Sequence, residues 1–215
     1  MEAYYRERAS EYDAFYRRPE HRNDLARLRI WLARHTRGRF ILEVAAGTGY
    51  WTRVAAACAS AITATDYNPE TLAIAARRLA RNVVLLPADA HELPQFTTPF
   101  DVGMAHLWWS HIEIQKRRNF LIHLASRLRP RATLLMIDQV HVDGFSIPAS
   151  RWDRHGNRYE RRTLRNGRTY EVVKNYSGAE ELRKSFNVVC SDVRVTRLKY
   201  FWALQARLRS PLAGG

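Results

Sequence analysis

The chain has 215 residues and a mass of 25.0 kDa, which is enough for one domain with a sizeable core. Hydrophobic residues make up 46% of it and charged residues 26%, a balance that excludes disordered and fibrous proteins. The 35 basic residues outnumber the 21 acidic ones and give a formal net charge of +14. Such a charge indicates a nucleic acid, an anionic membrane or an acidic substrate as partner, although a GC-rich coding sequence would also produce the excess of Arg.

Several classes of protein are excluded early. No window approaches the ~20 consecutive apolar residues of a membrane span, and the first residues, MEAYYRERASEYD, lack the apolar core of a secretory signal. The two cysteines, Cys58 and Cys190, cannot build a disulfide framework or a four-ligand zinc site, and we interpret both as buried thiols. We therefore expect a cytoplasmic protein that needs no metal and is a monomer or a homodimer.

The hydrophobic pattern predicts a helical N-terminal segment followed by alternating strands and helices. Apolar and aromatic residues follow helical spacing over residues 1–38, with a break near Pro19. Short apolar runs then alternate with amphipathic stretches of helical length. The predicted strands are 40–44, 62–66, 82–86, 100–105 and 132–138, and the predicted helices are 51–59, 69–81 and 112–128. This alternation is typical of βαβ units in a doubly wound, mostly parallel sheet.

The alternation ends after residue 138, where a polar, Arg-rich segment begins. Within it, residues 158–164 and 168–174 predict a β-hairpin around Asn166-Gly167, because Asn-Gly is the preferred dipeptide of two-residue hairpin turns. A turn of that length would place Arg162 opposite Glu171 as a favourable cross-strand pair.

The C-terminal part predicts one helix and two strands. Ser177 and Glu180 have the spacing of a capping box, which predicts a helix that Ser177 caps and that continues to residue 186. The β-type runs 188–195 and 198–204 are too close together for a helix between them. We therefore expect these last two strands to be antiparallel.

The motif with the most chemistry is ILEVAAGTGYW, which covers residues 41–51 and predicts a strand, a tight turn and a helix. Gly47 and Gly49 would let the backbone approach a ligand, and Asp66, at the end of the next strand, could accept hydrogen bonds from a ribose diol. A dinucleotide site would require a small residue at the place of Thr52. It would also have no use for Glu43, whereas a cofactor with a sulfonium and an amino-acid tail would.

These residues resemble the class I S-adenosylmethionine-dependent methyltransferases, in particular the small-molecule branch related to quinone-biosynthesis methyltransferases. LEVAAGTG, ATDYNPETLAIA and LLPADAHELP carry the resemblance, which covers residues 40–138 and, by topology, the last two strands. It implies a Rossmann-like α/β fold with a seven-stranded, mostly parallel sheet whose last strand is antiparallel. Residues 1–215 would form a single domain, made of a helical lid (1–38), a cofactor-binding core (39–138), a substrate-side insertion (139–176) and a C-terminal helix and strands (177–208).

The same resemblance implies S-adenosylmethionine as cofactor, S-adenosylhomocysteine as product, and a set of binding residues. Glu43 and the turn 45–49 would hold the methionine part, and Asp66 would hold the ribose hydroxyls. The turn residues concerned are Ala45, Gly47, Thr48 and Gly49, and the residues at the adenine are Tyr67, Asp89 and Ala90. Tyr12, or as second choice Tyr5, would cover the cofactor from the lid.

Candidate catalytic residues follow the fourth and fifth strands, whose ends would face the sulfonium. His106 could act as a base or orient the nucleophile, because imidazole titrates near neutral pH, and it could equally contact the cofactor. His111 could play the same part. Asp138 could be a base or an anchor, or it could cap a loop. Trp108 and Trp109 could form a substrate-binding wall, with one of them belonging to the core.

The segment 151–168 contains seven arginines, and these suggest a grip on an anionic substrate. Alternation along a strand would put Arg158 and Arg162 on one face, where bidentate hydrogen bonds could hold an acidic group. A solvated hairpin would have the same composition. The net charge is +4 over residues 1–40, −2 over residues 41–110 and +12 over residues 111–215, so the excess avoids the predicted cofactor half.

The leading hypothesis is a methyltransferase that modifies an O, N or S atom of a small, anionic metabolite. The alternative is an RNA or protein methyltransferase that uses the basic C-terminal half, although a nucleic acid is not the favoured partner. A phospholipid methyltransferase and a non-catalytic cofactor-binding module are further alternatives.

Overall fold

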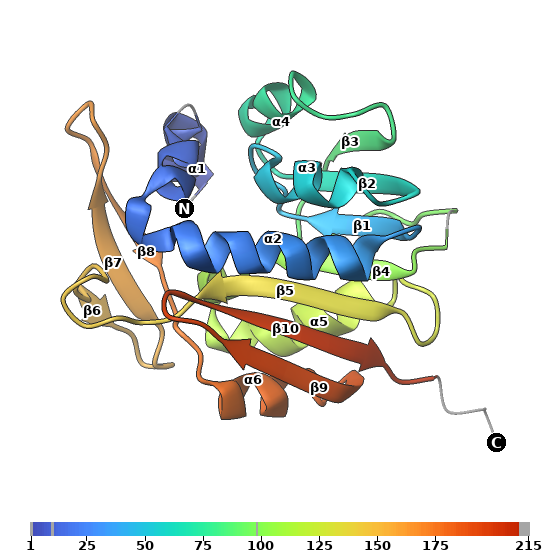
Figure 1. Ribbon diagram of the computed structural model, residues 1–215. Helices are drawn as coiled ribbons and strands as arrows, with labels where there is room; N and C mark the ends of the chain where they lie inside the picture. The colour runs from blue at the N-terminus through green and yellow to red at the C-terminus, as the bar shows by residue number, and fades with distance from the viewer. Residues whose placement is uncertain (1, 10, 98, 211–215) are drawn as a thin grey trace.

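A seven-stranded sheet runs through the middle of the protein (Figure 1), in the order β3-β2-β1-β4-β5-β10-β9. The computed structural model describes residues 2–9, 11–97 and 99–210. The strands are β1 (Phe40–Val44), β2 (Ala61–Asp66), β3 (Val83–Pro87), β4 (Val102–His106), β5 (Thr133–Gln139), β9 (Cys190–Arg197) and β10 (Phe201–Leu208). Strands β1 to β5 pair in parallel, whereas β10 is antiparallel to both β5 and β9. The predicted fold class is confirmed.

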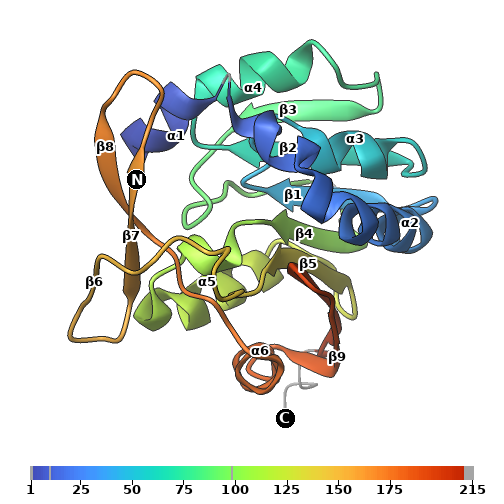
Figure 2. The ribbon, with the colours of Figure 1, turned by 60° about the vertical axis from the view of Figure 1, so that its left-hand side comes forward.

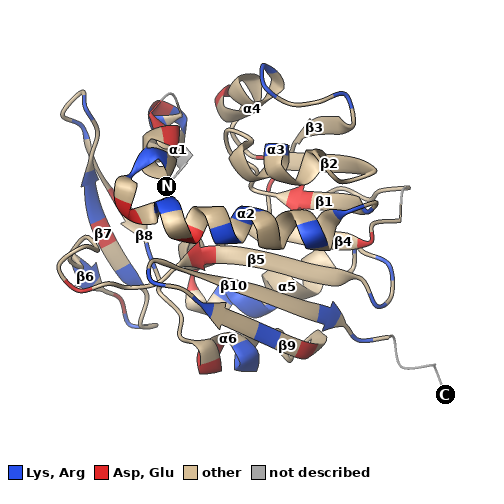
Figure 3. Ribbon diagram, viewed as in Figure 1, with Lys and Arg blue, Asp and Glu red and all other residues tan. Residues whose placement is uncertain are grey.

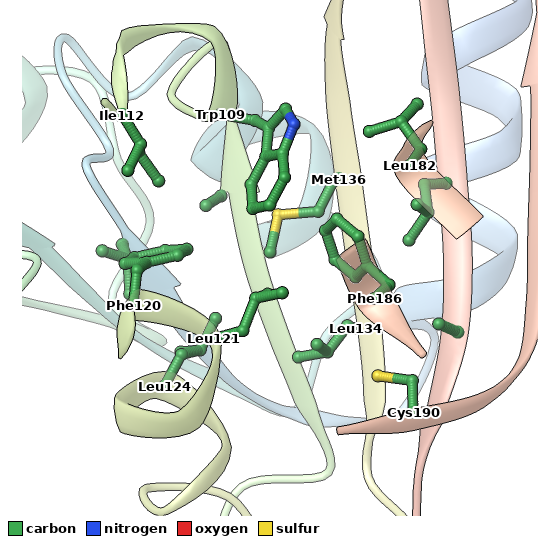
Figure 4. Packing of buried hydrophobic residues seen from close by; sticks show 14 of the residues in the cluster. Trp109, Ile112, Phe120, Leu121, Leu124, Leu134, Met136, Leu182, Phe186 and Cys190 are labelled. Carbon is green, nitrogen blue, oxygen red and sulfur yellow. The ribbon is translucent and has the colours of Figure 1, made fainter. Parts of the chain in front are cut away.

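Helices cover both faces of this sheet. The helices are α2 (Arg22–Thr36), α3 (Tyr50–Ala56), α4 (Pro69–Ala76), α5 (Arg117–Ala125) and α6 (Ala179–Phe186). On one face, α2 and α3 pack on residues such as Ile41; on the other face, α5 and α6 pack on residues such as Leu42. Neighbouring residues of β1 enter different cores because successive side chains of a strand point to opposite faces. Figure 4 shows the second of these cores, with Phe120 and Phe186 inside it.

The N-terminal segment consists of α1 (Glu2–Arg8) and two short 3-10 helices, η1 (Tyr12–Arg17) and η2 (Pro19–His21). The predicted break at Pro19 is present, since Pro19 begins η2. Helix α1 packs on a second, three-stranded sheet, where Tyr4 joins Leu164 and Val172 in a small apolar cluster. Figures 1 and 2 show α1 between this sheet and the main body of the protein.

The second sheet contains the predicted hairpin, but with another register. Its strands are β6 (Arg151–Trp152), β7 (Arg158–Thr163) and β8 (Thr169–Val173). Arg161, not Arg162, lies opposite Glu171, so the predicted pair is wrong by one residue. The reason is the loop: the Leu164 amide donates to the Arg168 carbonyl, which leaves a three-residue loop that ends at Gly167 with φ +80. A type I turn followed by a left-handed glycine is the usual form of such loops.

Three predicted helices also differ in the structure. Helix α6 begins after Gly178, and Ser177 does not cap it; its hydroxyl lies 3.0 Å from Glu181 Oε1 and accepts a hydrogen bond from Arg117. The segment predicted as one helix over 112–128 contains a short 3-10 helix, η4 (Ile114–Lys116), followed by α5. Helix α4 ends at residue 76, five residues before the predicted end at 81.

None of the described helices is long and apolar enough to cross a membrane. Over residues 2–9, 11–97 and 99–210, no group of three or more His, Cys, Asp or Glu side chains is arranged to hold a metal ion. Cys190 is a buried free thiol, as predicted, whereas Cys58 is only partly buried.

Candidate functional site

A cavity of about 550 Å³ lies at the carboxyl ends of β1, β2 and β4. Parallel strands end at the same edge of a sheet, so loops that are distant in sequence meet there. Most of the predicted cofactor residues line this cavity. They are Tyr5, Tyr12, Ala45, Gly47, Thr48, Asp66, Tyr67, Asp89, Ala90 and His106.

The turn after β1 is held open by its backbone conformation. Ala45, Gly47 and Gly49 all have positive φ, of 55°, 57° and 77°. At Gly49 a Cβ atom would lie 3.1 Å from the Cβ of Ala75 on α4, so this glycine also allows the turn to approach α4 closely. Ala45 adopts the same left-handed region despite its side chain, at some cost in backbone energy.

Asp66 at the end of β2 fixes the same turn. One carboxylate oxygen accepts a hydrogen bond from the Gly47 amide at 2.8 Å, and the other accepts bonds from the Asn68 amide at 2.9 Å and the Thr71 hydroxyl at 3.0 Å. A carboxylate offers about four lone-pair sites. Asp66 therefore organises the floor of the cavity and retains capacity to accept a ligand hydroxyl.

Glu43 on β1 is a buried carboxyl group next to this turn. It is 1% exposed, and its Oε2 has no hydrogen-bond partner among the described residues. Burial raises the pKa of Glu43 to about 8, with the negative charge of Asp66 adding to the rise. A buried, unpartnered carboxyl group favours a cationic ligand group beside it, because the cation would stabilise the ionised form.

The residues expected at the adenine also line this cavity. Tyr67 is about half exposed, and Ala90 is buried. Asp89 accepts a hydrogen bond from the His91 amide at 2.8 Å, which fixes the loop after β3. Trp108 also lines this cavity, and its indole Nε1 has no partner among the residues that the structure describes.

The N-terminal segment closes over the cavity from above the turn. The Thr48 hydroxyl donates to Asp13 Oδ1 at 2.6 Å, and Arg78 pairs with the same carboxylate. The rings of Tyr16 and Tyr50 stack with centroids 3.6 Å apart. Through these contacts η1 docks directly on the turn and on α3. The predicted lid segment is therefore in contact with the turn of the candidate site.

A second cavity, of about 580 Å³, lies between the N-terminal segment, the hairpin and the ends of β4 and β5. It shares four lining residues with the first: Tyr5, Tyr12, Leu107 and His111. Its charged lining residues are Arg8, Arg18, Arg161, Arg162 and Arg165, with Glu11 and Glu160. The charged residues of the first cavity are mainly acidic: Asp66, Asp89, Glu113 and Glu171, with Lys116. The two cavities are therefore adjacent, and their charged lining residues are mostly of opposite sign.

The predicted arginine pair surrounds a buried carboxylate. Arg158 and Arg162 lie on one face of β7, as alternation predicts, and both donate to Glu160, at 2.6 Å and 2.7 Å. Glu160 is 1% exposed, so the two guanidinium groups compensate a buried negative charge. Arg162 also lines the second cavity, whereas Arg158 lines neither cavity.

His106 ends β4 and points into the first cavity. It is buried, and neither ring nitrogen has a hydrogen-bond partner among the described residues. Burial lowers the pKa of His106 to about 3, so the ring is neutral near pH 7. Its ring lies 5.5 Å from that of Trp51, in an edge-on arrangement. A neutral ring with two unused nitrogens can donate one hydrogen bond and accept another from a ligand.

His111 lies where the two cavities meet. Its Nδ1 is 2.7 Å from the Val173 carbonyl oxygen, and its Nε2 is 2.8 Å from the Tyr5 hydroxyl. The pKa of His111 lies well below its usual value, chiefly because the ring is buried and also because Lys174 and Arg162 are positively charged. His111 is therefore held as a neutral ring between the lid and the hairpin.

Comparisons with known proteins agree with this geometry. The family described as "Methyltransferase domain" matches residues 41–131, the part that contains the turn, Asp66 and His106. The structure titled "DhpI-SAH complex structure" has a TM-score of 0.77 and 28% identity, and the match covers 96% of this chain and 94% of that one. The chain is a class I S-adenosylmethionine-dependent methyltransferase.

Two further structures show the range of this methyltransferase fold. "DhpI-SAM-HEP complex" matches with a TM-score of 0.77 and 27% identity over 95% of this chain and 94% of that chain. The [4+2]-cyclase SpnF matches with a TM-score of 0.61 and 19% identity over 86% of this chain and 81% of that chain, which supports the fold alone. No protein of curated function matches the chain by sequence.

The residues of the methyltransferase fit its cofactor. S-adenosylmethionine, when bound, supplies a methyl group on a positively charged sulfur. Glu43 Oε2, both nitrogens of His106 and Trp108 Nε1 are buried polar atoms without partners among the described residues, and buried polar atoms normally have one. The acidic lining of the first cavity also suits a cationic ligand.

Five predicted site residues of the methyltransferase line neither cavity: Glu43, Gly49, Trp109, Asp138 and Arg158. Asp138 is fully buried, accepts hydrogen bonds from the Ser110 amide and hydroxyl at 2.8 and 3.0 Å, and lies 3.4 Å from Lys174 Nζ. It thus holds the loop that carries His111. Trp109 is 1% exposed and packs on Phe186 in the core (Figure 4).

Sequence reasoning about the methyltransferase missed other residues of the site. Arg8 and Arg161 line the second cavity, and Lys174 anchors Asp138, yet none of them belongs to a motif. Lys174 carried one signal: it is one of four lysines among 35 basic residues and is the last residue of the predicted hairpin. Asp13 carried no signal, because its partners Thr48 and Arg78 come close only in the folded protein.

Proposed function

We propose that this methyltransferase transfers the methyl group to an O, N or S atom of a small metabolite that carries an anionic group. The observation that supports this most strongly is the pair of adjacent cavities whose charged lining residues are mostly of opposite sign. The acidic cavity suits the cationic cofactor, and the arginines of the second cavity suit an acidic acceptor, because guanidinium groups bind carboxylates and phosphates in a bidentate manner.

The arginines have different availability for such an acceptor. Arg162 is already bound to Glu160. The Arg8 guanidinium lies over the rings of Tyr4 and Tyr12, at 5.5 and 5.3 Å from their centres, and these contacts leave its donors free to point elsewhere. We therefore infer that Arg8 and Arg161 contact the acceptor and that Arg162 mainly supports the wall of the second cavity.

The chain's own residues would act mainly by positioning. Methyl transfer is an in-line displacement, and holding two reactants in line can supply a large part of its acceleration. In this proposal Asp66 and Asp89 hold the adenosine part, Glu43 holds the amino group, and His106 contacts the cofactor near the reacting end. The lid excludes water from the junction of the two cavities. The related DhpI, whose structure is titled as a complex with SAM and HEP, holds a second ligand together with SAM.

The experiment is methylation of a metabolite extract with labelled S-adenosylmethionine, after separation of the extract by anion exchange. We expect label in an anionic, low-molecular-weight fraction, and we expect Asp66→Ala to abolish it. Label found only in RNA, in protein or in lipid would contradict the proposal in favour of the corresponding alternative, and failure to bind S-adenosylhomocysteine would favour a non-catalytic protein.

The arginine contacts are tested with a matched control. Arg8→Gln and Arg161→Gln should each raise the KM for the acceptor about tenfold or more, because a hydrogen bond to a charged group contributes roughly 1.5–3 kcal/mol. The KM for S-adenosylmethionine should change little. Arg154 belongs to the same Arg-rich segment but lines neither cavity, so Arg154→Gln should leave both values unchanged. Equal effects of all three variants would indicate nonspecific attraction.

A further inference from the structure

The Tyr5 hydroxyl and the His111 imidazole meet at the junction of the two cavities. Tyr5 Oη lies 2.8 Å from Nε2 of His111 and 3.3 Å from Nδ1. Both side chains line both cavities. Any ligand pair that occupied the two cavities and reacted would therefore meet beside these two groups.

The Val173 carbonyl determines which nitrogen of His111 carries the proton. A carbonyl oxygen only accepts hydrogen bonds, so Nδ1, at 2.7 Å from it, is the N–H of the neutral ring. Nε2 then carries the lone pair and accepts the hydrogen bond of Tyr5. Burial raises the pKa of Tyr5 far above its usual value, so its hydroxyl keeps its proton near pH 7. The result is two hydrogen-bond contacts in series, between Tyr5 and Nε2 and between Nδ1 and the Val173 carbonyl.

We propose that Tyr5 is a catalytic residue that takes the proton of the acceptor and passes its own proton to His111. The proposal rests on the methyl transfer proposed above and adds that the acceptor atom carries a proton before the reaction. Tyr5 can do this because its oxygen retains lone pairs while its hydrogen is bound to Nε2.

The atoms and charges of the step balance. The acceptor atom forms a bond to the methyl carbon, and the electron pair of the broken carbon–sulfur bond stays on sulfur. The acceptor's proton moves to Tyr5 Oη while the original Tyr5 proton moves to His111 Nε2. One positive charge disappears from sulfur and one appears on the imidazole ring. The low pKa of His111 opposes uptake of the proton during the step and favours its release after the reaction.

Tyr12 provides the internal comparison. It lines the same two cavities and belongs to the same N-terminal segment as Tyr5. It lies beside Tyr5, with ring centroids 6.2 Å apart, yet only Tyr5 is bonded to His111. A role in covering the cofactor would apply to both tyrosines, whereas proton transfer would apply to Tyr5 alone.

The kinetic test uses single turnovers with labelled S-adenosylmethionine and the anionic extract fraction that accepts label, in H₂O and in D₂O. Tyr5→Phe and His111→Gln should each slow the methyl-transfer step about 10²–10⁴-fold, the usual range for general acid–base catalysis. The wild type and Tyr12→Phe should share the same solvent isotope effect, and Tyr5→Phe should lose most of it. A rate within twofold of wild type for Tyr5→Phe, or an unchanged isotope effect, would overturn the proposal.

A second readout needs no reaction. Nitrogen NMR of the imidazole in the ligand-free protein should show His111 as the Nδ1–H form, and Tyr5→Phe should shift the Nε2 signal, while Tyr12→Phe should not. Equal shifts in both variants, or the Nε2–H form in the wild type, would also overturn the proposal. If the wild type binds no S-adenosylhomocysteine or labels no metabolite, the proposed function itself fails. The NMR measurement needs no reaction, so it still tests the contact between Tyr5 and His111 when the proposed function has failed.

Discussion

Cofactor binding should depend on pH through Glu43. Burial raises its pKa to about 8, so the carboxyl group is mostly protonated at pH 6 in the cofactor-free protein. If this group receives the amino group of the cofactor, the positive charge favours the carboxylate and lowers the pKa in the complex. Binding below pH 8 must then release a proton, so affinity should rise as pH rises towards 8.

The size of the pH effect on affinity follows from the change in the pKa of Glu43 on cofactor binding. Each pH unit below the pKa of the free protein costs a factor of about ten, or about 1.4 kcal/mol, as long as the carboxyl group is ionised in the complex. Between pH 7.5 and pH 5.5 the affinity for S-adenosylhomocysteine should therefore fall about 100-fold, or by about 2.7 kcal/mol. Glu43→Gln cannot ionise at this position, so its affinity should be lower at pH 7.5 and nearly independent of pH.

The assay is isothermal titration calorimetry with S-adenosylhomocysteine at pH 5.5, 6.5 and 7.5, in buffers with different heats of ionisation. These buffers report the number of protons released, which should approach one for the wild type at pH 6.5 and zero for Glu43→Gln. Equal affinity of the wild type at pH 5.5 and 7.5, with no proton release, would refute the role of Glu43 in binding the amino group.

Three further changes have expected outcomes. Asp13→Asn removes the charge that receives Thr48 and Arg78, and by calorimetry it should weaken S-adenosylhomocysteine binding by about 1 kcal/mol, roughly fivefold. Gly103→Ala places a Cβ 2.6 Å from a methyl carbon of Leu128 and should lower the free energy of unfolding in urea by about 1–2 kcal/mol. Lys174→Met leaves the buried Asp138 charge unpaired and should cost about 3–5 kcal/mol in the same assay, most of which Lys174→Met/Asp138→Asn should restore.

The cofactor half of the site was predictable because its signals are local in sequence. Glu43, Gly47 and Asp66 lie at the ends of short apolar runs, and the carboxyl ends of parallel strands must meet at one edge of the sheet. The sheet itself followed from alternation of strand and helix patterns, and the order β3-β2-β1-β4-β5-β10-β9 agrees with it. For these residues the motif, the predicted strands and helices, and the fold all indicate the same position for the cofactor site.

The acceptor half was less predictable because its residues come together only through tertiary contacts. The hairpin register failed at Gly167, where a three-residue loop replaced the expected two-residue turn. Alternation correctly placed Arg158 and Arg162 on one face but could not show that Glu160, between them on the same face, binds both. Arg8 joins the second cavity from the other end of the chain, and no local pattern encodes that contact.

The Arg-rich segment gives a last test of the basic surface as a nucleic-acid site, because most of its arginines are already in ion pairs. Lys and Arg occur on many elements, with Asp and Glu between them (Figure 3). Five of the seven arginines between residues 151 and 168 form ion pairs within the chain: Arg151, Arg158, Arg162, Arg165 and Arg168. The hairpin therefore has little charge left for a long row of phosphates.

The salt dependence of the KM for the acceptor distinguishes a small anionic acceptor from a nucleic acid. A small anion that is held by one or two guanidinium groups should lose less than about tenfold in affinity between 50 and 200 mM salt, because few counterions are released. A nucleic acid bound through 6–10 phosphate contacts would lose about 10³–10⁵-fold over the same range. The measurement is the KM for the labelled acceptor at both salt concentrations, with S-adenosylmethionine saturating. A loss of the larger size would mean that the basic surface, and not the second cavity, binds the acceptor.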